Sequence, residues 1–253
     1  HVAHDELFGG PVQRDRGADG KRGQQLHAQN GVDLGDERHA DPAVVAALQT
    51  ALLAGADRAK QQLELAAAIE NLTYDSATGA VAFRVQNQSG HKLISGFPEG
   101  RRMFVNVKAF AGGELIYEVN PYDAAAGTLK GLGYTYLGEG LASPAPLGPN
   151  ELYDDALVYE MHPSSTLTAE LETFHFALAD GRYKDNRIPP KGFRIAQAAA
   201  RHSVPVDHGV EDPAYYTAAE YAGGYDDVSL SIPAGADAIE VTLYYQTTSR
   251  EYI

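Results

Sequence analysis

Short runs that alternate between apolar and polar or small side chains recur through the chain after about residue 72. In one of them Val81, Phe83 and Val85 are each separated by a single residue. A period of two is typical of half-buried β-strands. Residues that favour turns separate the runs, so we expect strands near 81–88, 103–110, 114–119, 156–162, 172–178, 227–232 and 239–247. Short strands joined by turns favour an antiparallel β-sandwich of immunoglobulin-like type over residues 72–253.

A different period precedes the strands. Asp41 and Pro42 form a helix start signal, since Asp accepts from the free N–H groups of the first turn and Pro needs no donor there. Steps of three and four then separate the apolar residues Val45, Leu48, Leu52, Ala56, Ala59, Leu63 and Ala66. This stripe predicts one long amphipathic helix over residues 41–71, ending at Asn71. The predicted fold class is therefore α+β, mainly β.

Residues 1–40 follow neither period. They are polar and Gly-rich, and they contain His1, His4, His27 and His39. We expect an irregular, His-bearing arm that becomes ordered only against a partner or cofactor. The chain begins without Met and ends in a strand-like run, and we expect it to be a processed product or a piece of a longer protein.

Composition excludes several classes of partner and chemistry. The formal net charge of −14 argues against nucleic acid and anionic membrane surfaces, which both need a basic footprint. No run approaches the ~20 apolar residues of a membrane span. The chain has no Cys, which removes disulfides, thiolate sites and every Cys-x-x-Cys-His haem-attachment motif. It also lacks the motifs of nucleophile elbows, P-loops, dinucleotide sites and His-Glu-x-x-His metalloproteases, so an enzyme is the less favoured class.

The stretch from Gln88 to Arg102 joins two predicted strands and is too long for a tight hairpin. Loops between rigid strands often carry function. His91 could ligate a metal or could hydrogen-bond a backbone carbonyl and fix the loop. Arg101 and Arg102 could hold a propionate or carboxylate between them, or could form ion pairs with acidic residues of the chain. Two further long loops, 121–155 and 178–226, leave a Ca²⁺ site as an alternative, although no acidic segment has EF-hand spacing.

Several segments resemble the C-terminal part of certain bacterial multihaem c-type cytochromes. The most specific reads Gly-His-Lys-Leu-Ile-Ser-Gly-Phe-Pro-Glu-Gly-Arg-Arg at residues 90–102, where the family pattern has Pro-Thr in place of Ile94-Ser95. The others are Thr173-Phe-His-Phe-Ala-Leu178, the run from Arg182 to Phe193, and the ending from Tyr244 to Ile253. A segment at His4, His-Asp-Glu-Leu-Phe-Gly-Gly, is similar to a family segment whose His commonly serves as a distal haem ligand.

The resemblance implies haem c carried by a missing segment or by a partner chain, because this chain has none of the attachment motifs. It also implies His4, His91 and His27 as axial ligands of haem iron, with Arg101 and Arg102 near the cofactor. Three interpretations remain open: the C-terminal portion of a cytochrome, a separate subunit docked on a haem-bearing chain, or a haem-less descendant that kept only the sandwich. The implied location is exported, in the periplasm or outside a bacterial cell.

We therefore expect a non-haem-attaching portion or subunit of a multihaem electron-transfer assembly. It would shield haems and supply one or two axial His ligands to a haem-bearing segment or subunit. The alternative is a haem-less exported β-sandwich that binds protein or glycan through its long loops. A homo-oligomer is compatible with either hypothesis.

Overall fold

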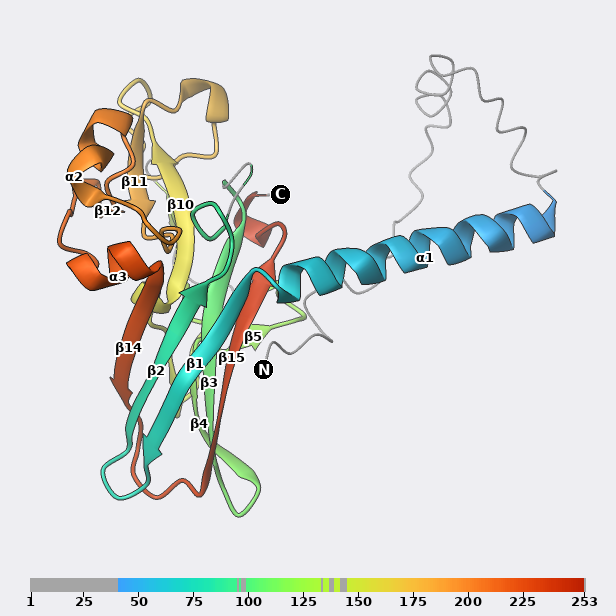
Figure 1. Cartoon of the computed structure of the whole chain (residues 1–253), viewed down its shortest axis with the longest axis vertical. Coiled ribbons are helices and arrows are strands. Elements are labelled where there is room, and N and C mark those ends of the chain that lie inside the picture. The colour runs from blue at the N-terminus through green and yellow to red at the C-terminus, as the bar shows by residue number, and fades with distance from the viewer. Residues whose placement is uncertain are drawn as a thin grey trace. The chain divides into compact units, whose positions relative to one another are not determined.

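The computed structural model describes residues 41–94, 96, 99–132, 134–136, 139–141 and 145–252 (Figure 1). The chain separates into two units, which we describe one at a time. The described part of the first is helix α1 (Pro42–Glu64), and the second, from Leu65 onward, consists mainly of β-strands. The predicted class, one long helix followed by β-sheets, is confirmed. The predicted arm at residues 1–40 lies outside the described residues.

Helix α1 begins where the sequence predicts. The Asp41 carboxylate accepts a hydrogen bond from the Ala43 N–H at 2.8 Å, and the Asp41 carbonyl accepts the first helical bond, from Val45. The helix ends at Glu64, and residues 67–75 form a strand, so its predicted extension to residue 71 is wrong. Ala and Glu have high helix propensity, but here pairing with the next strand and burial of Ala67 outweigh that weak local preference.

The smaller sheet has three antiparallel strands in the order β1 (Ala67–Asp75), β2 (Ala80–Asn87) and β14 (Tyr225–Ser231). Asn71 adopts a left-handed conformation (φ 55°) where the register of β1 shifts between Glu70 and Thr73. The predicted turn at 75–79 joins β1 to β2. Gly79 has a φ of 76° there, and a Cβ atom on it would lie 2.0 Å from the Ile232 carbonyl oxygen.

The strands of the larger sheet are β3 (Arg102–Ala111), β4 (Glu114–Val119), β9 (Glu151–Leu152), β10 (Val158–Ser164), β11 (Gly181–Asp185), β12 (Val206–Asp207), β13 (Val210–Glu211) and β15 (Ala238–Gln246). They follow the order β13-β12-β11-β10-β3-β4-β9, and β15 also pairs with β3. Their pairings are antiparallel except for β4 with β9. Two ribbons lie outside this sheet, β5 (Tyr122–Asp123) with β6 (Thr128–Leu129) and β7 (Tyr134–Tyr136) with β8 (Glu139–Leu141).

The two sheets share one hydrophobic core. Phe83 and Val85 of β2 pack in the same cluster as Val105 and Val107 of β3 and Leu243 of β15. These side chains are almost fully buried. Sheets that bury their inner faces against each other form a sandwich. The alternation seen in the sequence thus reflects one face turned to the core.

Short helices lie in the connections between strands. Helix α3 has the clearest sequence signal, a capping box in which the Thr217 side chain accepts from Glu220 N and the Glu220 side chain accepts from Thr217 N. No described helix is both long and apolar enough to cross a membrane. The short helices are η2 (Asp155–Leu157), η3 (Phe176–Leu178), α2 (Ile195–Ala198), η4 (Ala199–Arg201), α3 (Ala218–Gly223) and η5 (Arg250–Tyr252).

Five of the seven predicted strands are confirmed with small changes at their ends, as β2, β3, β4, β14 and β15. The strand predicted at 156–162 lies slightly later, at 158–164, because a 3₁₀ turn precedes it. The strand predicted at 172–178 is wrong, since this segment ends in η3 and Phe176 is 64% exposed. There the Glu170 carboxylate accepts hydrogen bonds from the hydroxyls of Thr168 and Thr173, which favours a compact loop over an extended strand.

Candidate functional site

The connection between β2 and β3 is fixed at its start by one buried side chain. Asn87 is fully buried, and its Nδ2 group donates to the carbonyl oxygens of His91 (2.7 Å), Ile188 (3.1 Å) and Pro189 (3.1 Å). Leu93 then pairs with Ile188 through a single β-bridge, in which Leu93 N donates at 2.8 Å. This connection, which we call the central stretch, is therefore attached to the segment after β11, about a hundred residues later in the chain.

An ion pair strengthens the same attachment. Lys92 Nζ lies 3.0 Å from Asp185 Oδ2, and the Asp185 side chain is only 2% exposed. Arg187 also contacts Asp185, at 2.8 Å. Burial alone would raise the pKa of Asp185, but hydrogen bonds from Arg187 and the charge of Lys92 lower it to about 2. Burial lowers the pKa of Lys92 despite its acidic partner.

A buried polar cluster lies where β3, β10 and β11 meet, and we define it as Arg102, Glu160, His162 and Lys184. The Glu160 carboxylate is at its centre: Oε1 lies 3.0 Å from Lys184 Nζ, and Oε2 lies 3.0 Å from His162 Nε2. Arg102 NH1 is 3.8 Å from Glu160 Oε2, and Arg102 Nε donates to Gln246 Oε1 at 2.7 Å. One carboxylate is thus surrounded by three basic side chains.

The charged groups of the buried polar cluster stabilise one another's ionised forms. Burial opposes ionisation of Glu160, yet Lys184 and His162 hold the pKa of its carboxyl well below its ordinary value. Burial likewise opposes the protonated form of His162, but the adjacent Glu160 raises the pKa of the imidazole. The pKa of Lys184 is also raised by Glu160 against the effect of burial. The cluster is therefore an ion-pair network that holds fixed charges inside the protein, and no member has the geometry of an activated nucleophile.

The predicted site residues do not form one group among the residues that the structure describes. His91 is exposed, and its ring has no hydrogen-bond partner there. Arg101 is partly exposed, whereas Arg102 is buried in the cluster, which favours the ion-pair interpretation of Arg102 over the propionate one. His4 and His27 lie outside the described residues. Within the described part of the chain, no three His, Asp or Glu side chains are placed to hold a metal ion.

Sequence reasoning missed the acidic centre of the cluster. Glu160 and His162 belong to no motif, and Lys184 lies in the resembling segment 182–193 without a predicted role. The one available signal was the position of Glu160 within the predicted strand 156–162, since a charged residue in the middle of an apolar run is buried only when paired. Their pairing depends on the register between β10 and β11, which the sequence does not show.

The segments that carry the resemblance lie together in the fold. The Lys92–Asp185 ion pair joins the first of them to the third, and the rings of Phe174 and Tyr252 join the second to the fourth, with centroids 5.8 Å apart. We call this group the motif region, and its described residues fall in the ranges 90–94, 96, 99–102, 173–178, 182–193 and 244–252.

Two further hydrogen bonds close the motif region. Arg102 Nε donates to Gln246 Oε1, and Ser249 N donates to the Gly100 carbonyl at 2.6 Å. Both join the first segment to the last, across most of the β-rich unit in sequence. Four segments that are far apart in the chain therefore meet through specific polar and aromatic contacts.

Comparison with known proteins adds little beyond the fold. No protein-family profile matches the chain, and no curated protein matches it. Among solved structures, part of a penta-heme cytochrome c552 from Thermochromatium tepidum is similar, with 13% sequence identity and a TM-score of 0.39. The similarity covers 76% of this chain and 34% of that one, so this chain spans about a third of the cytochrome. The absence of Cys means that this chain does not attach haem c covalently.

Proposed function

We propose that this chain is a non-haem-attaching portion or subunit of an exported multihaem electron-transfer assembly. The observation that supports the proposal is the motif region: the four segments with the sequence resemblance to multihaem cytochromes contact one another instead of being scattered over the surface. Four short segments that resembled the family only by chance would have no reason to lie together in the fold. In the proposed role the β-rich unit covers haem edges held by another segment or chain and excludes water from them.

Axial ligation is the second part of the proposal. His91 is exposed at the start of the central stretch, and within the described structure its imidazole makes no hydrogen bond that would compete with iron. A neutral imidazole is the usual proximal or distal ligand of haem iron. We assign the same role to His4 and His27 on the basis of sequence alone. Arg101 ends the same loop, and Arg102 begins β3, where its Nε donates to Gln246 of β15.

Isolation of the native assembly under non-denaturing conditions tests the first part. The chain should co-elute with a Soret absorbance, and mass spectrometry of the separated polypeptides should find haem on a different segment or chain. If this chain elutes free of haem absorbance while a haem protein from the same source elutes elsewhere, the proposal is wrong.

Single variants test the ligand assignment. In the assembly, His4→Ala, His27→Ala or His91→Ala should convert one low-spin haem to a high-spin form, because loss of an axial imidazole leaves iron five-coordinate. His208→Ala is the matched control, since this exposed His lies outside the motif region and its Nδ1 lies 2.8 Å from Asp207 Oδ1. Unchanged spin state in all three variants would exclude these residues as ligands.

One observation favours the alternative, an exported interaction module without a redox role. The connection between β10 and β11 carries apolar side chains at the surface, with Leu167 73%, Leu171 61% and Phe176 64% exposed. Apolar side chains gathered in one exposed loop are typical of a surface that binds another protein. In this alternative the native protein has a partner at this loop but no haem in the isolated complex.

A further inference from the structure

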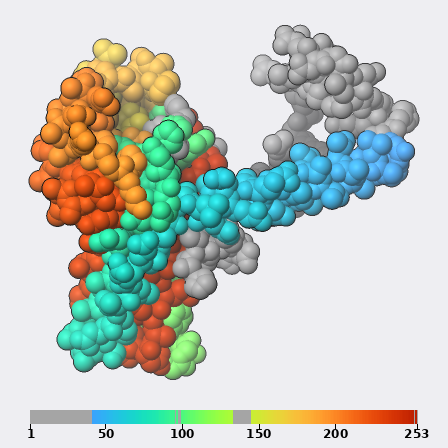
Figure 2. Space-filling view, in the orientation of Figure 1, coloured from blue at the N-terminus to red at the C-terminus, as the bar shows by residue number. Residues whose placement is uncertain are grey.

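A basic segment stands out in an acidic chain. Between Asn186 and Val206 the sequence contains no Asp or Glu, although the chain as a whole has a net charge of −14. The segment includes α2 and η4 and lies at the surface (orange in Figure 2). It carries Lys191, Arg194 and Arg201 within eleven residues. Local charge is therefore opposite in sign to that of the protein.

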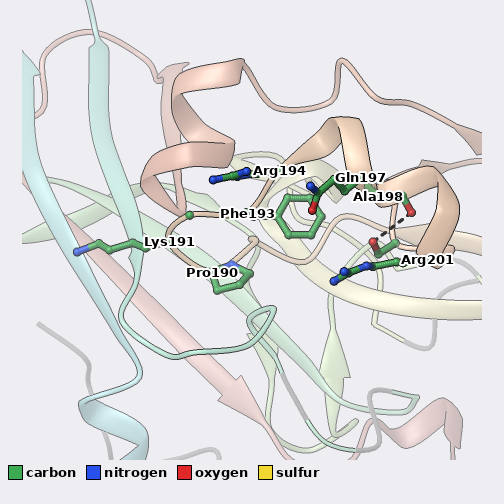
Figure 3. Close-up of a pocket in the computed structure, with 9 residues that line it drawn as sticks. Pro190, Lys191, Phe193, Arg194, Gln197, Ala198 and Arg201 are labelled. Carbon is green, nitrogen blue, oxygen red and sulfur yellow. Dashed lines mark hydrogen bonds between the residues drawn. The ribbon is translucent and has the colours of Figure 1, made fainter.

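The same segment forms a pocket of about 250 Å³. In Figure 3 the side chains of Arg194 and Arg201 lie on opposite sides of the Phe193 ring, with Gln197 beside the ring, whereas Lys191 extends away from them. No acidic residue is among those that line the pocket, which are Pro190, Lys191, Gly192, Phe193, Arg194, Gln197, Ala198, Arg201 and Ser203.

The walls of the pocket are held in place by contacts outside it. Phe193 packs against Tyr221, with ring centroids 5.7 Å apart. Gly192 N donates to the Ala222 carbonyl at 2.9 Å, and this bond attaches the segment to α3. Ser203 Oγ donates to the Ala198 carbonyl at 3.3 Å across the end of η4. These contacts order the backbone and the Phe193 ring of the pocket before a ligand binds.

The two arginines are not neutralised within the described structure. Their guanidinium groups make neither a hydrogen bond nor an ion pair with any described residue. Other arginines of this protein are paired: Arg84 with Asp227 at 2.7 Å, and Arg187 with Asp185 at 2.8 Å. Both side chains are exposed, so their donors are hydrated by water and remain available to an anion that enters the pocket.

We propose that this pocket binds a small anion with at least two negative charges, either a dicarboxylate or a phosphate group. Each guanidinium presents a planar pair of donors that matches two oxygens of a carboxylate or phosphate. The Gln197 amide supplies a further donor, and the face of Phe193 packs against the carbon skeleton or the guanidinium planes. This inference does not depend on the proposed electron-transfer role.

The ligand is a small molecule and not an acidic protein surface. At a distance the net charge of −14 repels a large polyanion, whose charge must approach many acidic groups at once. A small anion in the pocket lies next to the guanidinium groups that line it, while the more distant carboxylates are screened by salt. The pocket volume of about 250 Å³ also suits a small ligand.

Calorimetric titration of the full chain tests the proposal, with succinate in one arm and inorganic phosphate in the other. Uncharged succinamide is the control for charge. We expect saturable binding of one anion per chain in at least one arm, and the preferred arm distinguishes carboxylate from phosphate recognition. Each of Arg194→Gln and Arg201→Gln should weaken binding at least about tenfold, because each removes charge-assisted hydrogen bonds.

Arg58→Gln is the matched control, since it makes the same change of charge at an exposed position of α1. It should leave the affinity within about twofold. Circular dichroism and the unfolding midpoint verify that each variant is folded. The proposal is overturned if neither anion binds saturably, if succinamide binds equally well, or if Arg58→Gln weakens binding as much as the pocket variants do.

Discussion

Replacing Glu160 by Gln should destabilise the fold more than any change of a surface carboxylate. Glu160 is 4% exposed and lies within 3.0 Å of both Lys184 and His162. Gln has nearly the same shape but leaves these cations and Arg102 without their central negative charge. Breaking a buried ion pair from one side costs about 3–5 kcal/mol. For a domain of this size that corresponds to a fall of roughly 6–20 °C in the midpoint of thermal unfolding.

The pH dependence gives this prediction a second readout. The pKa of Glu160 is lower in the folded protein than its ordinary value of 4.5, so its ionised form stabilises the fold above that value. This contribution is lost as the pH falls through the lower pKa of the folded state. The difference in free energy of unfolding between the wild type and Glu160→Gln should therefore be full at pH 7 and shrink in acid.

Urea denaturation at several pH values measures both effects. Glu114→Gln is the matched control because Glu114 is exposed at the start of β4, and it should change stability by less than about 0.5 kcal/mol. Glu160→Gln combined with Lys184→Met should recover part of the loss, since it also removes the buried cation that would keep only the half-exposed Asp155 as its partner. If Glu160→Gln is no more destabilising than the control, the buried polar cluster does not have the energetic role that we assign to it.

Two further predictions concern stability. Burial raises the pKa of Asp226 from 3.8 to about 6 despite a 2.7 Å hydrogen bond from the Tyr159 hydroxyl. Ionised Asp226 therefore destabilises the fold increasingly between these two pH values and fully above pH 6. Asp226→Asn should stabilise the fold by up to about 3 kcal/mol in urea at pH 8 but by little near pH 4, and an equal gain at both pH values would contradict this. Gly79→Ala should destabilise by about 2 kcal/mol or more in the same assay, because its Cβ would meet the Ile232 carbonyl at a φ of 76°. The control Gly113→Ala has a similar φ of 84° but open space, and an equal loss in both variants would exclude the steric contact as the cause.

The sequence predicts the sheets well where one face is buried. Alternation at Val81, Phe83 and Val85 identified β2 because these three side chains point into the shared core. It failed at 172–178, where Phe174 and Phe176 also alternate but hydrogen bonds to Glu170 close a loop. The end of α1 was predicted too late because local propensity cannot register that residues 67–75 have a partner strand.

The candidate site was only partly predictable for a related reason. The central stretch was identified as a loop of interest from its composition, and Arg102 was named with it. Its partner Glu160 lies 58 positions later in the sequence, and Lys184 a further 24. Such long-range pairs depend on strand order and register, which one sequence alone does not encode in any local pattern. His4 and His27 remain sequence-based predictions.

The central claim is that this chain works in an assembly that contains haem. Its most direct test is the absorption spectrum of the protein isolated from its native source without denaturation, first oxidised and then reduced. We predict a Soret band with sharp α and β bands after reduction, and mass spectrometry of the same sample should place the haem on another segment or chain. A spectrum with only the ultraviolet band of Tyr would contradict the claim and leave the haem-less interaction module as the better account.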